Sequence, residues 1–380
     1  MPPTTAQTTI PSTITNAPLL SDVFASRQSA AFADTSRCEI DDITPDSPGG
    51  SIARTSGFDI PAEAAPLVGD VWLRIVPVET SDLEMGRKRV ELLEETLEIV
   101  SEFFREQSYD LANLLYFSEE ESDWVQFSET GESLGFVGSE PKKDMAALME
   151  AILLETRPSE DSRDTQLVLA LLPPEPSSTV EQATRRFQLD LVNGMRLENG
   201  ILMSANFVTN WKMLAHELGH SWLRTEDLYQ HSYFGSGQDF FGRWDIMSMA
   251  SGPDPEFSSW FRWRSGWLSD DQVYCIEGAL EVELFLQPLQ TKSGLAKSAM
   301  VRLSDHSLLV IEVREHQYSR DIAETLLVYV VDTSFEHGNG PFRLVGTIDE
   351  DGQDLDWEDV TIRRSQSDSS GMVVTVISPT

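Results

Sequence analysis

The stretch His216-Glu217-Leu218-Gly219-His220 decides which fold and which chemistry the rest of the chain must accommodate. On a helix, two histidines four residues apart project from the same face, about one turn from each other. The carboxylate of Glu217 can reach a metal-held water without binding the metal itself. Zinc in catalytic sites takes three protein ligands and keeps one position open for such a water. The stretch therefore predicts a helix on which His216 and His220 bind Zn²⁺ and Glu217 is the general base for a metal-activated water.

The residues before and inside this stretch favour a helix with a close neighbour. Thr209 or Asn210 is a natural N-cap, and residues 211–215 open the helix. Glycine costs about 1 kcal/mol in a helix interior relative to alanine, so we expect another part of the chain to approach the backbone at Gly219. Only six histidines occur in 380 residues, and two of them lie here. That concentration argues against a chance match on a purely structural helix.

A third protein ligand is expected shortly after the helix. Glu226 and Asp227 lie ten and eleven residues after His216, the distance at which one branch of the zinc peptidases supplies its last ligand. Either residue can instead be an ordinary solvated acid, the commoner role of Asp and Glu. Further along, Met247 in residues 242–248 (GRWDIMS) fits the methionine turn that supports the metal from below in the same branch, although methionine is more often part of a core.

Taken together, these motifs resemble the immune inhibitor A family of bacterial zinc metallopeptidases, distant relatives of the metzincins. The family's active-site stretch reads approximately HELGHxLGLPDLY, and residues 216–229 read HELGHSWLRTEDLY. Other similar stretches occur in the family's order at residues 103–109 (FFREQSY), 244–248 (WDIMS), 258–268 (SSWFRWRSGWL), 309–314 (LVIEVR) and 327–332 (LVYVVD). The resemblance spans about residues 70–335. It implies a zincin-like fold, one catalytic Zn²⁺, polypeptide substrates and secretion from the cell.

The turn after the helix departs from the family pattern. Its glycine and proline are replaced in residues 223–225 (LRT), and one residue is inserted. Counting without a gap makes Glu226 the third ligand, whereas matching the triplet Asp-Leu-Tyr makes it Asp227. We favour Asp227 and keep both as candidates.

The group that would stabilise an oxyanion is also altered. Some metzincins place a tyrosine two residues after the turn methionine, but Met249 occupies that position here. Tyr229, His231 and Tyr233 are the candidate replacements. The altered turn leaves an alternative function open, a catalytically inactive zincin-fold binding or interaction protein. The intact histidines and glutamate of the helix argue against that alternative.

Hydrophobic periodicity divides the chain into three parts. Residues 1–65, rich in Thr, Ser, Pro and Ala, predict a flexible arm or pro-segment. Residues 66–270 predict an α/β (α+β) domain with a mixed sheet, which the resemblance implies is a zincin-like catalytic domain, and residues 271–380 predict a β-rich C-terminal subdomain. In the catalytic domain we expect helices at 87–107 and 143–156 and strands at 71–78, 166–172 and 201–207. In the C-terminal subdomain we expect strands at 282–286, 299–303, 308–313, 326–331 and 372–376.

Composition excludes several classes of partner. The formal charge is −35, from 63 acidic and 28 basic residues, and such a surface repels nucleic-acid phosphates and anionic lipids. No apolar run has the roughly 18–20 residues that a membrane-spanning helix needs. No signal peptide is visible, so the extracellular location is an implication of the resemblance alone. The acidic tract 349–356 could bind calcium, but it fits no twelve-residue calcium loop and is better explained as a solvated turn. The sequence specifies no oligomeric state.

Two cysteines leave one bridge or two free thiols open. Cys38, in the predicted arm, follows Arg37 and precedes Asp41, which loosely resembles the cysteine switch of matrix metalloproteinases. In that hypothesis the Cys38 thiolate occupies the open zinc position until the arm is removed. The competing interpretation pairs Cys38 with Cys275.

Overall fold

The structure is a computed structural model of the whole chain. It describes residues 19–24, 32–43, 54–60, 64–135, 137, 145–156, 165–175, 182–190, 196–229, 240–252, 256–278, 280–315, 324–335 and 338–378. Within these residues the protein is a mixed α/β protein with three sheets and few helices.

The first sheet is mixed and contains strands from the first 204 residues. It consists of β1 (Gly69–Glu79), β2 (Ala112–Ser118), β3 (Val125–Gln126), β4 (Thr165–Leu172), β5 (Gln182–Asp190) and β6 (Arg196–Ser204). The order is β2-β1-β4-β6-β5, with β3 paired to the end of β1. All pairs are parallel except β5 with β6. The strands predicted at 71–78 and 166–172 are β1 and β4, whereas the strand predicted at 201–207 is the end of β6 and stops at Ser204.

Helices cover both faces of this sheet. α2 (Arg87–Gln107) has the predicted bounds, and its apolar stripe packs in one core with α5 (Trp211–Ser221) and one face of the sheet. α4 (Met145–Glu155), predicted at 143–156, packs on the opposite face. The short α3 (Gly131–Leu134) contributes to that second core. The sheet thus lies between two helical layers, and α5 is held in the larger of the two cores.

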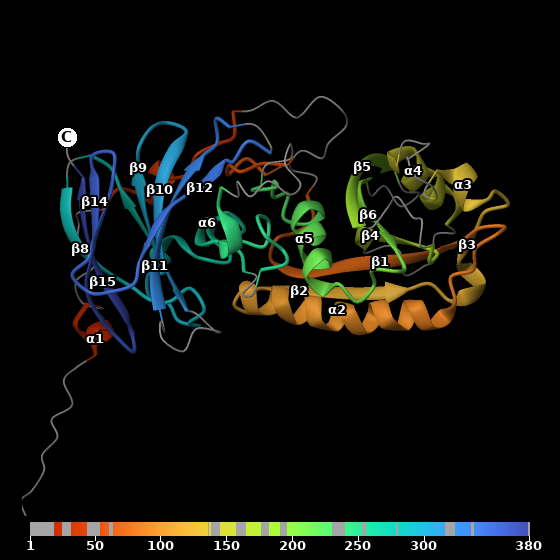
Figure 1. Cartoon of the computed structure of the whole chain (residues 1–380), viewed down its shortest axis with the longest axis horizontal. Helices are drawn as coiled ribbons and strands as arrows, with labels where there is room; N and C mark the ends of the chain where they lie inside the picture. The colour runs from red at the N-terminus through yellow and green to blue at the C-terminus, as the bar shows by residue number, and fades with distance from the viewer. Residues whose placement is uncertain are drawn as a thin grey trace, which may run out of the picture.

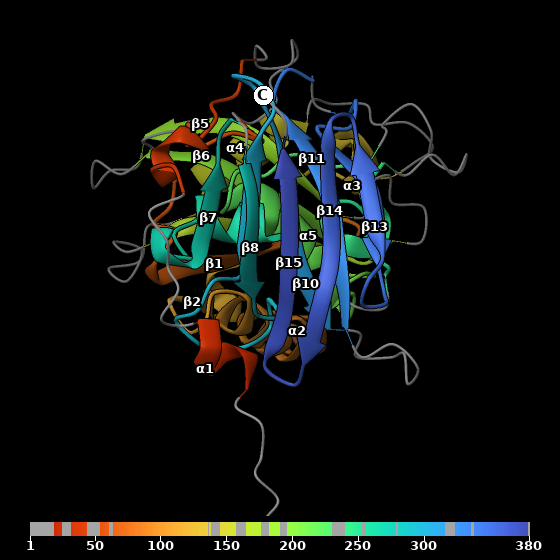
Figure 2. The same cartoon turned by 90° about the vertical axis from the view of Figure 1, so that its left-hand side faces the viewer.

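The C-terminal part is a sandwich of two antiparallel-rich sheets. One sheet has the order β12-β11-β10-β9-β7 and the other the order β13-β14-β15-β8. The strands are β7 (Val273–Ile276), β8 (Leu280–Leu286), β9 (Ser298–Arg302), β10 (Ser307–Glu315), β11 (Glu324–Asp332), β12 (Phe342–Ile348), β13 (Asp354–Trp357), β14 (Val360–Asp368) and β15 (Gly371–Ser378). All five strands predicted from the sequence in this region are present. Figure 2 shows the two sheets lying over one another, with β8, β15 and β14 nearest the viewer.

One strand shows how the sandwich joins the α/β part. In β10, Leu309, Ile311 and Val313 pack between the two sheets of the sandwich. The alternate residues Leu308 and Val310 face the core that contains α5. A strand that is apolar on both faces is buried on both faces. Figure 1 shows the result: α5 and α6 (Ser259–Arg264) lie between the sandwich and the first sheet.

The N-terminal region is partly built into this body. Residues 1–65 were predicted to be a flexible arm or pro-segment, but the described stretch 32–43 contacts the sandwich, and the described stretch 54–60 contacts α6 and the turn after α5. Cys38, after the short 3-10 helix Thr35–Arg37, forms a disulfide with Cys275. The cysteine-switch hypothesis is therefore wrong, because the sulfur that would have bound zinc is bonded to another sulfur and fully buried.

The remaining helices are all short. They are α1 (Leu20–Phe24) and the 3-10 helices Glu121–Asp123, Gly242–Trp244 and Asp270–Gln272. No helix among the described residues is long and apolar enough to cross a membrane.

In the acidic tract 349–356, Asp351 accepts a hydrogen bond from Arg364. Asp354 likewise accepts from Arg363 but already belongs to β13, so the tract predicted as a solvated turn is an exposed turn that leads into a strand.

Candidate metal centre

The helix α5 places its motif in the interior of the protein. The side chain of Asn210 accepts a hydrogen bond from the backbone N–H of Met213. Asn210, one of the two residues predicted as the N-cap, therefore caps the helix. Every residue from Leu214 to Ser221 is buried. His216 and His220 retain only 4% and 2% of their exposure. Buried polar side chains of this kind need partners.

The two histidines converge with Asp227 on one point. Their Nε2 atoms lie 3.1 Å apart. Oδ1 of Asp227 lies 3.1 Å from Nε2 of His216 and 3.0 Å from Nε2 of His220. Among the described residues, these three side chains form the group that could hold a metal ion. The structure thus brings both predicted histidine ligands together with one of the two candidates for the third.

Backbone carbonyls fix which nitrogen of each histidine carries the proton. Nδ1 of His216 lies 3.0 Å from the carbonyl oxygen of Ile246, and Nδ1 of His220 lies 2.8 Å from that of Thr225. A carbonyl oxygen only accepts, so each Nδ1–H is the donor. Each neutral ring then presents the lone pair of Nε2 toward Asp227. Metal-binding histidines are oriented in this way by their outer partners.

The three side chains fit a zinc ion. Three acceptor atoms about 3 Å apart repel one another unless a cation lies among them. With zinc–ligand distances of about 2.0–2.1 Å, a tetrahedral site separates its ligand atoms by about 3.3 Å, close to the 3.0–3.1 Å found here. Two imidazoles and one carboxylate also match the donor set of catalytic zinc centres.

The electrostatics of the two rings favour one positive charge at this point. Burial lowers the pKa of His216, but the hydrogen bond to Asp227 and the charge of that carboxylate outweigh burial, so the net pKa is raised. Burial, followed by the positive charge of Arg54, lowers the pKa of His220. The Asp227 carboxylate thus favours positive charge beside His216.

The turn after α5 separates the two candidates for the third ligand. Arg224 has a φ of +58°, the left-handed conformation that favours glycine, in the turn where the family resemblance expects a glycine. Beyond it, Asp227 turns toward the histidines. Glu226 instead accepts a hydrogen bond of 2.6 Å from the hydroxyl of Ser56. Burial raises the pKa of Glu226 to about 8. Glu226 is therefore not part of the convergent group.

Met247 lies against α5 in a turn that Asp245 organises. Oδ1 of Asp245 accepts from the backbone N–H of Met247 at 2.8 Å, and Oδ2 accepts from that of Ser258 at 2.7 Å. The backbone N–H of Leu228 donates to the carbonyl of Met247 at 3.0 Å. A Cβ atom at Gly219 would lie 2.5 Å from Sδ of Met247. The close approach predicted from the glycine is confirmed, and Met247 is the neighbour.

The remaining predicted residues are Glu217 and the candidates for the oxyanion donor. Glu217 is 7% exposed and is not one of the three convergent side chains. The ring of Tyr229 stacks on that of His216 with centroids 6.2 Å apart. Burial raises the pKa of Tyr229 above its ordinary value, and nearby carboxylates, Glu217 among them, add to the rise. Its hydroxyl therefore stays protonated. His231 and Tyr233 lie outside the described residues.

Two residues near the centre were not singled out from the sequence. Asp245 is buried, which raises its pKa to about 6, while hydrogen bonds from backbone N–H groups oppose that rise. An Asp two residues before a turn residue was an available signal, because Asp side chains bond the backbone two residues on. Arg54 forms an ion pair with Asp227. No local signal could find it, because 173 residues separate the two.

Comparisons with known proteins add little to this geometry. No protein-family model matches the sequence. No curated protein matches it either. Among solved structures, the crystal structure of metalloproteinase-II from Bacteroides fragilis is similar over 54% of this chain and 54% of its own, with 14% identity and a TM-score of 0.32. The match thus spans about half of either chain. At that TM-score the likeness supports no functional conclusion, and the immune inhibitor A resemblance stays a prediction.

Proposed function

We propose that this protein is a zinc-dependent endopeptidase in which His216, His220 and Asp227 hold the metal and Glu217 is the general base. The observation that carries the proposal is the convergence of three acceptor atoms within 3.0–3.1 Å of one another. Both Nδ1 protons are already donated to backbone carbonyls, so neutral rings can offer no proton to the carboxylate. A cation satisfies all three acceptors at once.

Each side chain around the metal has a distinct task in this proposal. When bound, Zn²⁺ supplies Lewis acidity, which acidifies water and polarises a scissile carbonyl. The Glu217 carboxylate accepts the proton of the attacking water and returns it to the nitrogen of the leaving amine. Tyr229 keeps its phenolic proton and is the described candidate for donating a hydrogen bond to the oxyanion.

The surroundings hold these groups in place. The carbonyls of Ile246 and Thr225 prevent the two imidazoles from rotating, since each ring would lose a buried hydrogen bond. Met247 fills the space beside Gly219 and fixes the distance between α5 and the turn that carries Ile246. Preorganised ligands of this kind keep the metal and the general base in a constant relation.

Metal analysis combined with a digestion assay tests the proposal. Purified protein is analysed for zinc, and casein digestion is measured with and without a chelator and after Zn²⁺ is added back. We expect a single zinc ion per chain and digestion that the chelator abolishes and zinc restores. Bound zinc without digestion under any condition would favour the alternative of an inactive zincin-fold binding protein. Absence of zinc binding would refute the proposed zinc peptidase.

We also propose an extracellular location. Disulfides persist in oxidising compartments and are rare where glutathione keeps thiols reduced. The bond between Cys38 and Cys275 is fully buried and supports this location. Recovery of the protein from culture medium with the bridge intact is the expected result, and a fully reduced protein confined to the cytosol would contradict it.

A further inference from the structure

The N-terminal stretch 54–60 contacts the candidate metal centre directly. Nη1 of Arg54 lies 3.2 Å from Oδ2 of Asp227, and the two side chains are only 14% and 7% exposed. The other oxygen of the same carboxylate, Oδ1, faces the histidines. The ion pair with Arg54 therefore favours the orientation of Asp227 in which Oδ1 faces the histidines. A carboxylate rotated about its terminal bond would exchange the two oxygens and lose this ion pair.

The two residues after Arg54 hold the turn on which Asp227 lies. The backbone N–H of Thr55 donates to the carbonyl of Arg224 at 2.9 Å. The hydroxyl of Ser56 donates to Oε2 of Glu226 at 2.6 Å. Three consecutive residues of the N-terminal stretch thus contact three of the four residues 224–227. Contacts to backbone and side chains together restrict the turn more than the single ion pair would.

The stretch is itself held by buried aromatic residues. The indole N–H of Trp260 donates to the carbonyl of Ser56 at 2.7 Å. The ring of Phe58 packs edge-on against Trp260 and Trp263, with centroids 5.2 and 4.5 Å apart. A Cβ at Gly57 would lie 2.3 Å from the backbone nitrogen of Asp42. The stretch 54–60 is therefore packed tightly against residues 41–42 on one side and against α6 on the other.

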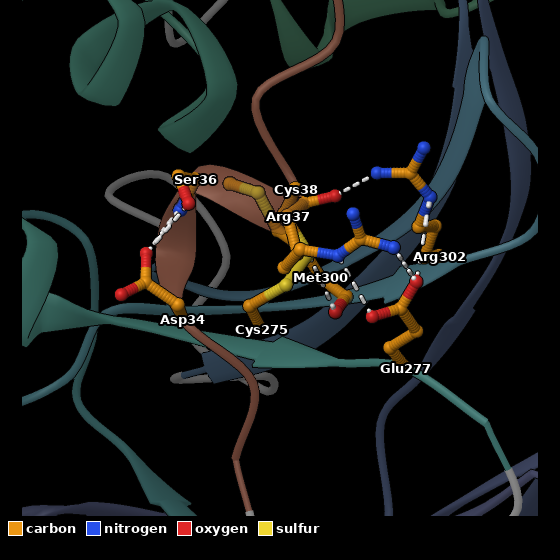
Figure 3. Close-up of a disulfide and its surroundings, with 8 residues drawn as sticks. All are labelled: Asp34, Ser36, Arg37, Cys38, Cys275, Glu277, Met300 and Arg302. Carbon is orange, nitrogen blue, oxygen red and sulfur yellow. Dashed lines mark hydrogen bonds and ion pairs between the residues drawn. A yellow bond between two sulfur atoms is a disulfide. The ribbon is translucent and has the colours of Figure 1, made fainter.

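Residues 32–43 connect this packing to the sandwich. The disulfide joins Cys38 to Cys275 in β7, and the backbone N–H of Ala33 donates to the carbonyl of Cys275 at 2.9 Å. Figure 3 shows the bridge beside the ion pair of Arg37 with Glu277. The described stretches 32–43 and 54–60, named the strap below, thus run from a covalent anchor on the sandwich to the third ligand.

We propose that Arg54 is a positioning residue for Asp227, presented by the strap, so that tight metal binding requires an N-terminal segment anchored to the C-terminal sandwich. The inference rests on the proposed function, since it assumes that Asp227 binds the metal. Its physical reason is the burial of Oδ2. Without Arg54, the largely desolvated carboxylate loses the cation that offsets its charge, and Asp227 relieves the penalty by leaving its place beside the histidines. Removal of such outer partners typically lowers metal affinity about 10- to 100-fold.

The opposing effect is electrostatic. The positive charge of Arg54 repels a divalent cation, so its removal could in principle strengthen binding. The pairing decides the sign, because Arg54 lies on the far oxygen of Asp227 while the metal position adjoins the near one. Loss of the buried ion pair between Arg54 and Asp227 costs the full desolvation penalty of the carboxylate. The repulsion between Arg54 and the metal ion acts over a longer distance and is reduced by the carboxylate between them.

Zinc affinity of the full chain, measured by competition with a chromophoric chelator, tests the inference. Arg54→Gln should weaken Zn²⁺ binding about 10- to 100-fold, and Arg54→Lys, which keeps the charge but loses the planar fork, should weaken it less. Arg37→Gln is the matched control, because Arg37 lies on the same strap but pairs with Glu277 at the surface. Its affinity should equal that of the wild type.

A spectroscopic readout separates positioning from general destabilisation. With Co²⁺ in place of zinc, the visible absorption bands should shift in Arg54→Gln and not in Arg37→Gln. Unchanged or tighter zinc binding together with an unchanged cobalt spectrum would overturn the inference. If Arg54→Gln does not fold, as judged by circular dichroism, the same two measurements on Arg54→Lys decide the question.

The anchor is tested separately from the arginine. A double substitution, Cys38→Ser with Cys275→Ser, removes the covalent tether but leaves Arg54 and its partner Asp227 unchanged. We expect weaker zinc binding in the folded double variant, and an affinity equal to that of the wild type would refute the role of the anchor. His216→Ala distinguishes a failure of the proposed function. Zinc binding that survives His216→Ala would mean that the metal lies elsewhere, whatever the Arg54 variants do.

Discussion

Substitution of Gly219 by alanine tests how closely the packing of α5 depends on the turn that contains Met247. In an ordinary helix interior this change stabilises a protein by about 1 kcal/mol. Here the added Cβ would lie 2.5 Å from Sδ and 3.2 Å from Cε of Met247, and 3.2 Å from Oγ1 of Thr225. Ordinary contacts between such atoms are about 3.5–4.0 Å. The sulfur must therefore move by about 1 Å.

The magnitude follows from the surroundings of the methionine. Met247 is fully buried, so its side chain cannot move into solvent, and overpacking of a core costs about 1–3 kcal/mol. Subtracting the helix gain leaves a net loss of roughly 1 kcal/mol in the free energy of unfolding. Displacement of the turn also disturbs the carbonyl of Ile246 that holds His216. We expect zinc affinity to fall by about tenfold, as for other outer partners.

A double-mutant cycle gives this reasoning a sharp test. Met247→Ala alone should cost about 2–5 kcal/mol because it leaves a cavity. In that background the contacts with Sδ and Cε are gone and the contact with Oγ1 of Thr225 remains, so Gly219→Ala should destabilise the protein less than it does in the wild type. The coupling between the two changes, measured by denaturant unfolding of the metal-free protein, is expected to be about 1–3 kcal/mol. Additive effects, with coupling below about 0.5 kcal/mol, would refute the proposed contact.

Three further predictions concern the ligands, the general base and a buried lysine. Glu217→Gln should lower casein digestion by about 10²- to 10⁴-fold and leave zinc bound; loss of the metal from the folded variant would contradict its role. Asp227→Ala should weaken zinc binding by more than the 10- to 100-fold expected of an outer partner, and Glu226→Ala by less; equal, small losses would show that neither carboxylate is the ligand. Burial lowers the pKa of Lys297 to about 7, below its ordinary value near 10.5, so the folded state binds fewer protons than the unfolded state between these values. Stability contributed by this group is present at high pH and is lost as the pH falls toward 7, with a slope of at most about 1.4 kcal/mol per pH unit. A Lys297→Met variant should lack that slope in urea titrations from pH 7 to 10, and an identical slope would refute the assignment.

The elements that could be predicted from the sequence are those with strong local periodicity. The 21-residue helix α2 was predicted with its bounds, because its apolar residues repeat at helical spacing and no β-branched run interrupts them. Strands buried on both faces, such as β1 and β10, have continuous apolar stretches that no surface helix would carry. The strands β2, β3, β5, β7, β12, β13 and β14 were not predicted. In β12, only the two end residues Phe342 and Ile348 are buried, so the stretch shows no sustained apolar pattern.

The residues of the candidate site also divide into those with a local sequence signal and those without one. His216, Glu217 and His220 could be found because four residues of helix fix their mutual geometry. Choosing Asp227 over Glu226 required the left-handed backbone of Arg224, a conformation that sequence patterns seldom predict for an arginine. The choice therefore had to rest on the family resemblance before the structure was considered.

The N-terminal segment shows why composition alone misleads about disorder. Residues 1–65 are poor in apolar periodicity, and that signal is correct for a chain that must form a core of its own. The described stretch 54–60 needs no such core, because Phe58 and the backbone of Ser56 use aromatic residues supplied by α6, more than 200 residues away. The covalent anchor at Cys38 further lowers the entropy that these residues lose on packing. A polar segment can thus be ordered by a distant surface. Cys38, predicted to block the metal centre, is instead bonded to Cys275 on the sandwich, and it is the later stretch 54–60 that lies beside Asp227.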